Sequence, residues 1–318
     1  MSGLRIVYMG TPDFAVSPLK ALIDSGHNIV GVVTNPDKPA GRGRKIKESP
    51  VKKFAVEKGL KVLQPEKFRN EEFLSELKEL KADLQVVVAF KMLPEVVWNM
   101  PKIGTINLHA SLLPHYRGAA PLNWVIINGE KRTGVTTFLL KHEIDTGNIL
   151  FSESVEIGDD ETVGELHDKL MIVGSELLVK TVDAIESSNY TLTNQNFLLK
   201  GENSKHAPKI FKDDCKINWD TNIDDIFNLI RGLSPYPAAW SVFESESGEK
   251  MNVKIYKARK ELSDSINKIG CLQSDGKTYL KVAVTGGHIY IDELQIAGKK
   301  RMFVQDFLRG FDIKPFLG

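Results

Sequence analysis

Apolar residues in the first part of the chain gather in short continuous runs that alternate with amphipathic stretches. The runs lie at 4–10, 28–34, 83–90, 102–110, 133–140 and 148–157, and stretches with helical spacing lie at 14–26, 50–59, 70–80, 119–128 and 161–187. Continuous apolar runs of this length are typical of parallel strands that are buried on both faces. Their alternation with helices predicts an open, twisted α/β sheet, in which ligands bind beyond the carboxyl ends of the strands.

The pattern changes after residue 188. Residues 189–208 are polar and interrupted, and they show neither helical nor strand periodicity. Beyond them a helical stretch at 223–233 precedes several short β-like runs separated by turn residues, which indicates a small barrel or sandwich. We therefore predict an α/β domain over 1–188, a linker over 189–208 and a smaller β-rich domain over 209–318.

The composition is that of an ordinary globular protein, with 42% hydrophobic residues, 26% charged residues and a net charge of +1 over 318 residues. This length favours two domains. The two cysteines, Cys215 and Cys271, have no metal-ligand spacing and suggest reduced thiols. No apolar run approaches the roughly 20 residues that a membrane helix needs, and the first residues lead into a predicted strand without a signal peptide. We expect a cytoplasmic protein with no membrane partner.

The segment NLHASLLPHYRG, residues 107–118, begins at the end of a predicted strand. Asn107 and His109 are two positions apart, so both project from the same side of that strand. A neutral imidazole can accept a proton near neutral pH, and a carboxamide can donate hydrogen bonds to a developing oxyanion. This pair suits attack of an amine on an activated acyl carbon. Asp145, in the turn EIDTG, is either a carboxylate that orients the imidazole or an Asx-type turn residue.

Other catalytic motifs are missing from the sequence. It contains no G-x-S-x-G, HExxH or CxxC motif, so neither a covalent nucleophile nor a metal is required, and direct transfer is the simplest chemistry. The first predicted strand-to-helix turn, MGTPDF (9–14), has a single glycine, which disfavours dinucleotide binding.

The densest charge cluster is the segment TNPDKPAGRGRKIK at 34–47, in which the only acidic residue is Asp37. Its prolines and glycines argue against a regular element and for an irregular surface loop. A solvated charge run and a set of phosphate contacts both fit this composition. The loop follows a strand at the same predicted sheet edge as His109, which favours phosphate contact.

The segment SLLPHYRGAAP (111–121) closely resembles a signature of enzymes that use 10-formyltetrahydrofolate, and Asn107, His109 and Asp145 match that family's catalytic residues. Within it, the chain resembles the methionyl-tRNA formyltransferase family. The stretches that resemble this family are GTPDFA (10–15), TNPDKPAGRGRKIKESPVK (34–52), DCKINWD (214–220), IRGLSPYPAAW (230–240) and LQIAGKKRM (294–302).

The resemblance implies a Rossmann-like formyltransferase domain with a parallel-rich twisted sheet, followed by an open, OB-like β-barrel domain. It implies transfer of a formyl group from 10-formyltetrahydrofolate to the amino group of methionyl-initiator tRNA by direct attack of the amine. His109 would take the amine proton or hold the tetrahedral intermediate, Asn107 would stabilise the oxyanion and Asp145 would orient His109. Nothing in the sequence demands a metal or a dimer, so we expect a monomer without a metal.

The same resemblance assigns binding residues. The folate contacts it implies are Phe90, Met92, Leu93, Ser111, Leu112, Leu113, Pro114, His142 and Asp145. The tRNA contacts it implies are Lys38, Arg42, Arg44, Lys45, Lys299, Lys300 and Arg301. One segment departs from the family: AFKMLP (89–94) is one residue shorter than the usual A-Y-G-x-I-L-P and lacks its glycine, so we expect a different loop geometry beside the folate.

Alternatives from other classes are weaker. A small-molecule formyltransferase acting on an amino sugar or on glycinamide ribonucleotide needs neither the basic loop nor the lysine-rich tail. A non-catalytic RNA-binding protein would be expected to have lost Asn107, His109 or Asp145, and all are present. A nucleotide-dependent dehydrogenase lacks its glycine fingerprint.

Overall fold

The computed structural model describes residues 3–40, 45–199, 201, 203–263 and 268–317, with the side chains of Ala40 and Lys45 outside the description. The chain forms two compact units. The first unit comprises Met1–Gly118, Thr133–Val155 and His167–His206, and the second comprises Ala119–Arg132, Glu156–Leu166 and Ala207–Gly318.

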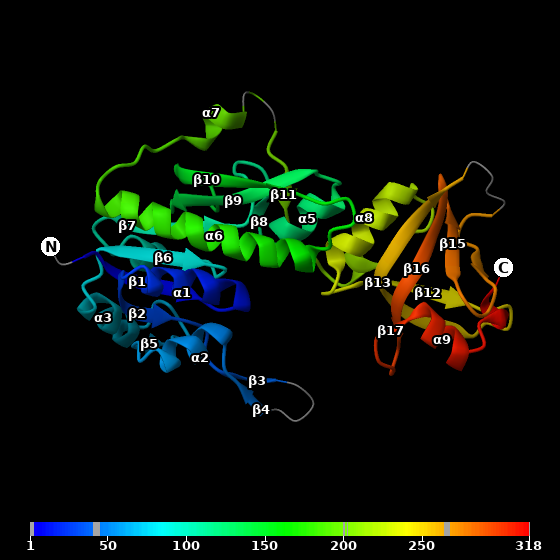
Figure 1. The fold of residues 1–318 in the computed structure, drawn as a ribbon. Helices are drawn as coiled ribbons and strands as arrows, with labels where there is room; N and C mark the ends of the chain where they lie inside the picture. Colours follow the sequence, from blue (N-terminus) through cyan, green and yellow to red (C-terminus); the bar gives the residue numbers. More distant parts are fainter. Residues whose placement is uncertain (1–2, 41–44, 200, 202, 264–267, 318) are drawn as a thin grey trace. The chain divides into compact units, whose positions relative to one another are not determined.

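The first unit is built on a seven-stranded sheet with the order β10-β9-β7-β6-β1-β2-β5 (Figure 1). Its strands are β1 (Arg5–Gly10), β2 (Asn28–Val33), β5 (Val62–Leu63), β6 (Leu84–Val88), β7 (Gly104–His109), β9 (Arg132–Leu139) and β10 (Ile149–Glu156). The five neighbouring strands β5, β2, β1, β6 and β7 are parallel, and β9 runs antiparallel to β7. The predicted Rossmann-like, parallel-rich sheet is confirmed.

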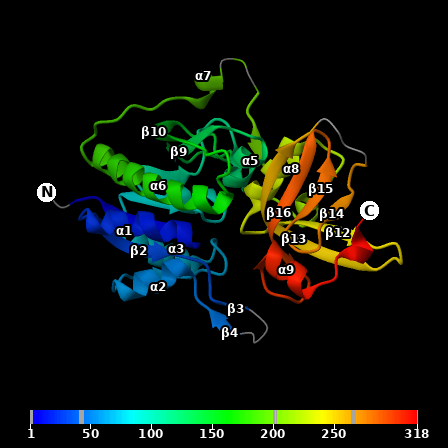
Figure 2. The same ribbon diagram turned by 45° about the vertical axis from the view of Figure 1, so that its right-hand side comes forward.

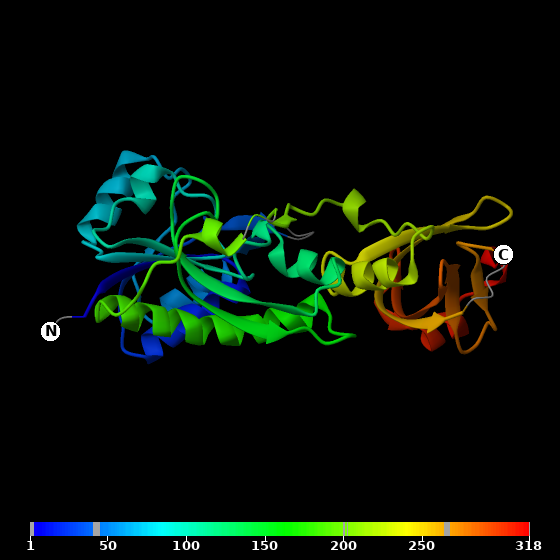
Figure 3. The same ribbon diagram turned by 90° about the horizontal axis from the view of Figure 1, so that it is seen from above.

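Helices cover both faces of this sheet. Those that follow the strands are η1 (Asp13–Ala15), α1 (Val16–Asp24), α2 (Pro50–Glu57), α3 (Glu71–Glu79), α4 (Glu95–Trp98) and α6 (Val163–Glu186). Helices α1 and α6 share one face, since the hydroxyl of Ser175 donates to that of Ser17 at 3.0 Å (Figure 3). On the opposite face Phe73 and Leu77 of α3 pack against Val7 and Met9 of β1.

The basic segment after β2 differs from its prediction. Strands β3 (Lys38–Ala40) and β4 (Lys45–Lys47) form an antiparallel pair in which Pro39 lies opposite Ile46 (Figure 1). The expectation of an irregular loop was wrong. In an isolated two-stranded ladder both strands are edge strands, and an edge strand tolerates a proline because only one backbone hydrogen-bond donor is lost.

The segment 189–208, predicted to lack regular structure, contains α7 (Gln195–Leu199) and β11 (His206–Ala207). Thr193 forms an antiparallel bridge with Ile149 of β10, through backbone hydrogen bonds of 2.8 and 2.9 Å. The backbone N–H of Tyr116, just before β8 (Arg117–Gly118), donates to the Lys205 carbonyl at 2.6 Å. These partners are distant in sequence, so local periodicity does not reveal them.

The second unit contains a curled antiparallel sheet with the order β12-β13-β16-β15-β14, with β17 beside β16 (Figure 2). The strands are β12 (Ala239–Glu244), β13 (Lys250–Leu262), β14 (Leu272–Ser274), β15 (Leu280–Val284), β16 (Gly287–Ile296) and β17 (Met302–Phe303). The register of β13 against β16 shifts on both sides of Lys257, and such bulges increase the bend and twist of a sheet. The predicted β-rich second fold is confirmed as an antiparallel half-barrel.

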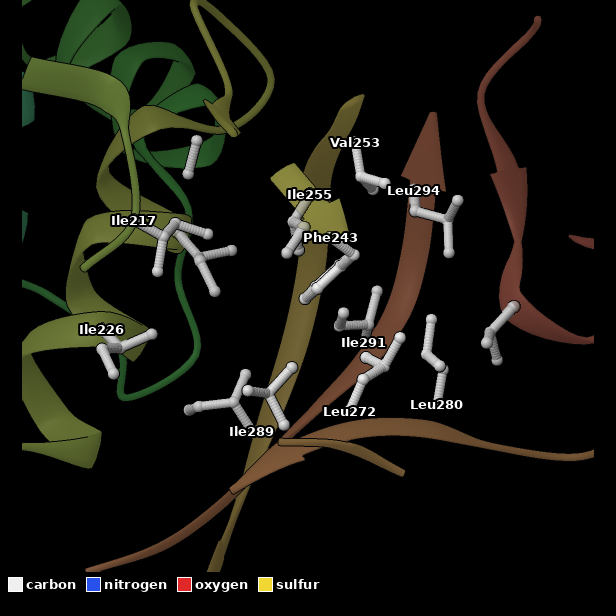
Figure 4. Packing of buried hydrophobic residues seen from close by; sticks show 14 of the residues in the cluster. Ile217, Ile226, Phe243, Val253, Ile255, Leu272, Leu280, Ile289, Ile291 and Leu294 are labelled. Atoms are coloured by element: carbon white, nitrogen blue, oxygen red, sulfur yellow. The ribbon is translucent and has the colours of Figure 1, made fainter. Parts of the chain in front are cut away.

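One apolar cluster fills the concave side of this sheet. Alternate residues of β13 and β16, such as Val253, Ile255 and Ile291, point into it (Figure 4). The remaining elements of the unit are α5 (Pro121–Ile127), η2 (Asp213–Cys215), α8 (Ile223–Leu233), α9 (Val304–Gly310) and η3 (Lys314–Phe316). Gly232 permits close packing of α8 on α5, because a Cβ there would lie 2.7 Å from the Ile127 side chain.

Candidate active site

Strand β7 presents two polar side chains on one face. Its Leu108 faces α6, since a Cβ on Gly174 of that helix would lie 3.1 Å from the Leu108 side chain. Because side chains alternate along a strand, Asn107 and His109 project from the opposite face. His109 is 7% exposed and Asn107 is half-buried. Within the described part of the chain, the Asn107 carboxamide forms no hydrogen bond, so both of its N–H groups are available to a ligand.

A backbone carbonyl orients the His109 ring. Nε2 of His109 lies 2.9 Å from the carbonyl oxygen of Tyr116. A carbonyl can only accept, so Nε2 bears the hydrogen and the neutral ring has its lone pair on Nδ1. Tyr116 has a φ of +61°, in the left-handed region, which turns the chain back toward β7. The basic atom that the site offers is therefore His109 Nδ1.

Asp145 lies beside this basic nitrogen. Its Oδ2 is 3.9 Å from His109 Nδ1 and accepts a hydrogen bond of 3.1 Å from the backbone N–H of Gly118. The longer distance exceeds that of a hydrogen bond, so it is the Tyr116 carbonyl that fixes the neutral ring. A proton on Nδ1 would face the Asp145 carboxylate. The structure thus brings two predicted residues together, with Asn107 on the same strand face.

Two further polar residues complete the surroundings of Asp145. Nε2 of Gln195 donates to the carbonyl oxygens of Asp145 at 2.8 Å and Gly147 at 2.7 Å. Its Oε1 accepts from Nε and Nη2 of Arg117 at 3.1 and 2.6 Å. Burial lowers the pKa of the Arg117 guanidinium, and the charges of Asp145 and Glu143 oppose that shift. Sequence reasoning missed Gln195, which lies in a polar stretch without periodicity.

The predicted folate contacts in the segments after β6 and β9 differ in exposure. Leu93 is buried in the core, and Phe90 packs against the same apolar cluster. Met92 is 75% exposed. The His142 side chain is 85% exposed, with Nδ1 4.0 Å from a carboxylate oxygen of Glu95. Only Met92 and His142 of this set are widely accessible.

The predicted folate contacts after β7 lie deeper. Ser111 is fully buried, and its hydroxyl donates to the His115 carbonyl at 2.8 Å. Leu113 and Pro114 are buried, and Leu112 is half-buried. These residues support the turn that carries Tyr116 mainly by packing and hydrogen bonding within the protein.

The predicted tRNA contacts near the β3–β4 pair are described only in part. Lys38 is exposed, Arg42 and Arg44 lie outside the described residues, and Lys45 is described by its backbone alone. Asp37, the acidic residue of this segment, forms an ion pair with Lys52, which holds the pKa of the carboxyl below its ordinary value.

The basic tail between β16 and β17 has two different kinds of cation. Lys299 and Lys300 are exposed. Arg301 instead contacts both carboxylate oxygens of Glu293, with Nε at 2.6 Å, and stacks 4.4 Å from the Tyr256 ring centroid. The Glu293 hydrogen bonds raise the pKa of Arg301.

The described residues contain no group of three or more His, Cys, Asp or Glu side chains placed to hold a metal ion. Among the helices that the structure describes, none is long and apolar enough to span a membrane.

Comparison with known proteins identifies the family of this chain. The chain matches the model of the formyl transferase family over residues 4–182 and that of the formyl transferase C-terminal domain over 209–312. It is 53% identical to methionyl-tRNA formyltransferase of Bacteroides thetaiotaomicron over 97% of this chain and 96% of the relative. The chain belongs to the methionyl-tRNA formyltransferase family. It is therefore a transferase.

A second relative and one solved structure are also similar to this chain. The family member from Flavobacterium psychrophilum is 49% identical over 99% of both chains. The crystal structure of an N-formyltransferase from Helicobacter canadensis with folinic acid and dTDP-3-aminofucose has a TM-score of 0.67 at 22% identity, covering 91% of this chain and 98% of that chain. At that identity the match establishes a shared fold.

Proposed function

We propose that the protein transfers a formyl group from 10-formyltetrahydrofolate to the α-amino group of methionyl-initiator tRNA, for translation initiation in the cytoplasm. The observation that carries the proposal is the placement of His109 Nδ1 beside Asp145, on the same strand face as the Asn107 carboxamide, which has no hydrogen-bond partner among the described residues. Near-complete coverage by relatives that bear the methionyl-tRNA formyltransferase name supports the choice of acceptor.

In this proposal the amine attacks the formyl carbon directly, without a covalent enzyme intermediate. Asn107 donates hydrogen bonds to the oxygen on which negative charge develops. His109 Nδ1 accepts the proton that the amine loses, and the Asp145 carboxylate stabilises the resulting imidazolium. The C–N bond to the folate then breaks, and His109 returns the proton to the departing folate nitrogen. Every proton is accounted for without a metal.

The donor would lie between the segment 86–94 and the turn 140–147. Met92 and His142, the accessible members of the predicted set, would contact it directly. Phe90, Leu93 and residues 111–114 would shape the wall against which it rests. Folate is a co-substrate here, and these residues would supply its binding and orientation.

The acceptor would be held by basic side chains of two segments. The acceptor arm would contact four basic residues of the segment 34–47, namely Lys38, Arg42, Arg44 and Lys45. Lys299 and Lys300 would contact phosphates elsewhere. Arg301 would contribute less, because Glu293 already neutralises it. We propose a monomer with a catalytic domain over 1–188, a linker over 189–208 and a tRNA-binding domain over 209–318.

A formylation assay tests this function. The protein is incubated with 10-formyltetrahydrofolate and, in parallel, charged methionyl-tRNA, uncharged tRNA, an amino sugar nucleotide and glycinamide ribonucleotide. We expect formyl transfer to methionyl-tRNA alone. Transfer to a small amine in preference to methionyl-tRNA would overturn the proposed acceptor, and no transfer at all would overturn the reaction.

A further inference from the structure

The side chain of Gln195 uses all of its hydrogen-bonding groups inside the first unit, at 1% exposure. Its amide hydrogens bind the carbonyl oxygens of Asp145 and Gly147, and its amide oxygen binds the Arg117 guanidinium. Carbonyls accept and guanidinium groups donate, so these partners define which end of the carboxamide faces which. This residue lies 50 positions from Asp145 and 78 from Arg117, in the segment 189–208 that the sequence predicts to be a linker.

The turn at residues 145–147, which Gln195 binds, has an unfavourable backbone conformation. Asp145 has a φ of +55°, a left-handed conformation that is unfavourable for a residue with a side chain. At Gly147 a Cβ would lie 1.5 Å from the carbonyl oxygen of Leu139, so the turn passes directly against β9. One carboxamide binds carbonyls at both ends of this short turn. It therefore fixes the direction in which the Asp145 side chain leaves the backbone.

Gln195 also restrains the group that binds the Asp145 carboxylate. Arg117, its second partner, directly precedes Gly118, whose N–H donates to Asp145 Oδ2 at 3.1 Å. The backbone of Asp145 and the donor to its carboxylate are thus connected through the same side chain. The distance of 3.9 Å from Oδ2 to His109 Nδ1 depends on both.

We infer that Gln195 is a positioning residue for formyl transfer, which holds the Asp145 carboxylate opposite His109 through the 145–147 turn and Arg117. The inference rests on the proposed role of Asp145. It makes the segment 189–208 part of the catalytic machinery of the first unit, whereas a predicted linker would be expected only to connect two domains. A misplacement of the order of 1 Å in such a group is sufficient to slow a reaction by about 10²-fold.

The test compares Gln195→Glu with Asn196→Ala, a control at the neighbouring exposed position. Because the glutamate substitution adds a charge, Gln195→Met, of similar length and uncharged, is measured beside it and replaces it if Gln195→Glu does not fold. Both Gln195 variants lose the donors to the turn. We expect kcat for formylation to fall about tenfold or more, with KM for tRNA and for the folate within about twofold of wild type, and no change in Asn196→Ala.

A double-mutant cycle with Asp145→Asn separates positioning from general destabilisation. If Gln195 acts through Asp145, Gln195→Met should lower kcat by less than about twofold in the Asp145→Asn background. An equal loss in both backgrounds, or an unchanged kcat in Gln195→Met while Asp145→Asn is impaired, would overturn the inference. A wild-type kcat in Asp145→Asn would instead overturn the proposed role of Asp145, which is a distinguishable result.

Discussion

The sheets of the two units differ in the side chains that they present: the first presents polar side chains at the end of one strand, and the second presents an apolar inner face. At the end of β7 in the first unit, Asn107 and His109 point into a region where Tyr116 and Asp145 adopt left-handed backbone conformations. In the second unit the inner face of the sheet is a continuous apolar cluster, and the curl comes from a register shift near Lys257. Strained backbone held by specific hydrogen bonds is typical of functional sites, whereas regular alternation is typical of a stable core.

The comparison shows what each sheet depends on. In the first unit single hydrogen bonds, such as that from His109 Nε2 to the Tyr116 carbonyl, determine which atoms are available for chemistry. In the second unit side chains such as Ile291 contribute chiefly by burial of apolar surface. Substitutions should therefore separate turnover from stability according to the unit in which they lie.

The largest effect is expected from His109→Ala. Loss of a general base lowers turnover by about 10²- to 10⁴-fold, and saturating tRNA should not restore it. The matched control is His288→Ala, which removes a second buried histidine, on β16 of the second unit, and should leave kcat unchanged. Steady-state formylation kinetics measure both. A wild-type turnover number in His109→Ala would remove the catalytic assignment.

Asn107→Ala should follow in size. Removal of one donor to a developing oxyanion costs about 10²- to 10³-fold in kcat. Because the Asn107 carboxamide has no hydrogen-bond partner among the described residues, the melting temperature should stay close to that of wild type. Formylation rates at saturating substrates, with thermal unfolding in parallel, check both statements. A large loss of stability with normal turnover would mean that Asn107 is a structural residue.

Ile291→Ala should show the opposite behaviour. It removes a buried side chain from the second unit's core, at a cost of about 2–5 kcal/mol in the free energy of unfolding. The kcat of the folded protein should be unaffected at temperatures where the variant is native. Chemical unfolding monitored by circular dichroism gives the stability. A fall in kcat while the variant is fully folded would show that the two units are not separable in this way.

Smaller effects are expected at the basic side chains. Lys38→Ala and Lys300→Ala each remove an exposed cation, so each should raise KM for tRNA several-fold and reduce the salt dependence of binding by about one unit of slope. Arg301→Ala should have less effect on KM, because Glu293 already pairs with that guanidinium. KM measured across a salt series distinguishes them. A larger effect for Arg301 than for Lys300 would contradict the proposed difference.

The smallest effect is a pH dependence of stability in the second unit. Burial, together with the charge of Lys281, lowers the pKa of His288, while the nearby Glu261 opposes the shift and has a lowered pKa itself. As the pH falls below the unfolded value of about 6.5, the unfolded chain takes up this proton first, so folding becomes less favourable. When the pH is lowered from about one unit above this unfolded pKa to about one unit below it, the melting temperature of His288→Gln should therefore fall less than that of wild type. Equal losses would contradict the shift.

Part of the geometry of the candidate site could be predicted from the sequence. Asn107 and His109 were found because the period of a strand and the loss of apolar character mark the end of β7. Local sequence leaves Asp145 as either an orienting carboxylate or a turn residue, because its distance from His109 depends on a fold in the β9–β10 connection that local sequence does not encode. Gln195 could not be predicted, since its partners are two backbone carbonyls and an arginine far along the chain.

In the basic segment 34–47 the sequence-based prediction was wrong. Its prolines and glycines suggested an irregular loop, yet Lys38–Ala40 and Lys45–Lys47 pair as strands. Prolines and glycines are common both in irregular loops and beside paired strands, so composition alone does not distinguish a loop from a strand pair.

The segment 89–94 lacks the glycine that is usual in the family. Ala89 in this segment adopts a φ of +46°, so the backbone reaches a conformation usual for glycine without having one.

A single-turnover rapid-quench experiment tests the central claim of direct transfer assisted by His109. Excess protein is mixed with 10-formyltetrahydrofolate carrying a labelled formyl group and with methionyl-tRNA, and label on the folate, protein and tRNA is followed with time. We predict that label passes to methionyl-tRNA in one phase with none on the protein, and that His109→Ala slows this phase by about 10²-fold or more. Label on the protein before it reaches the tRNA, or an unchanged rate in His109→Ala, would contradict the mechanism.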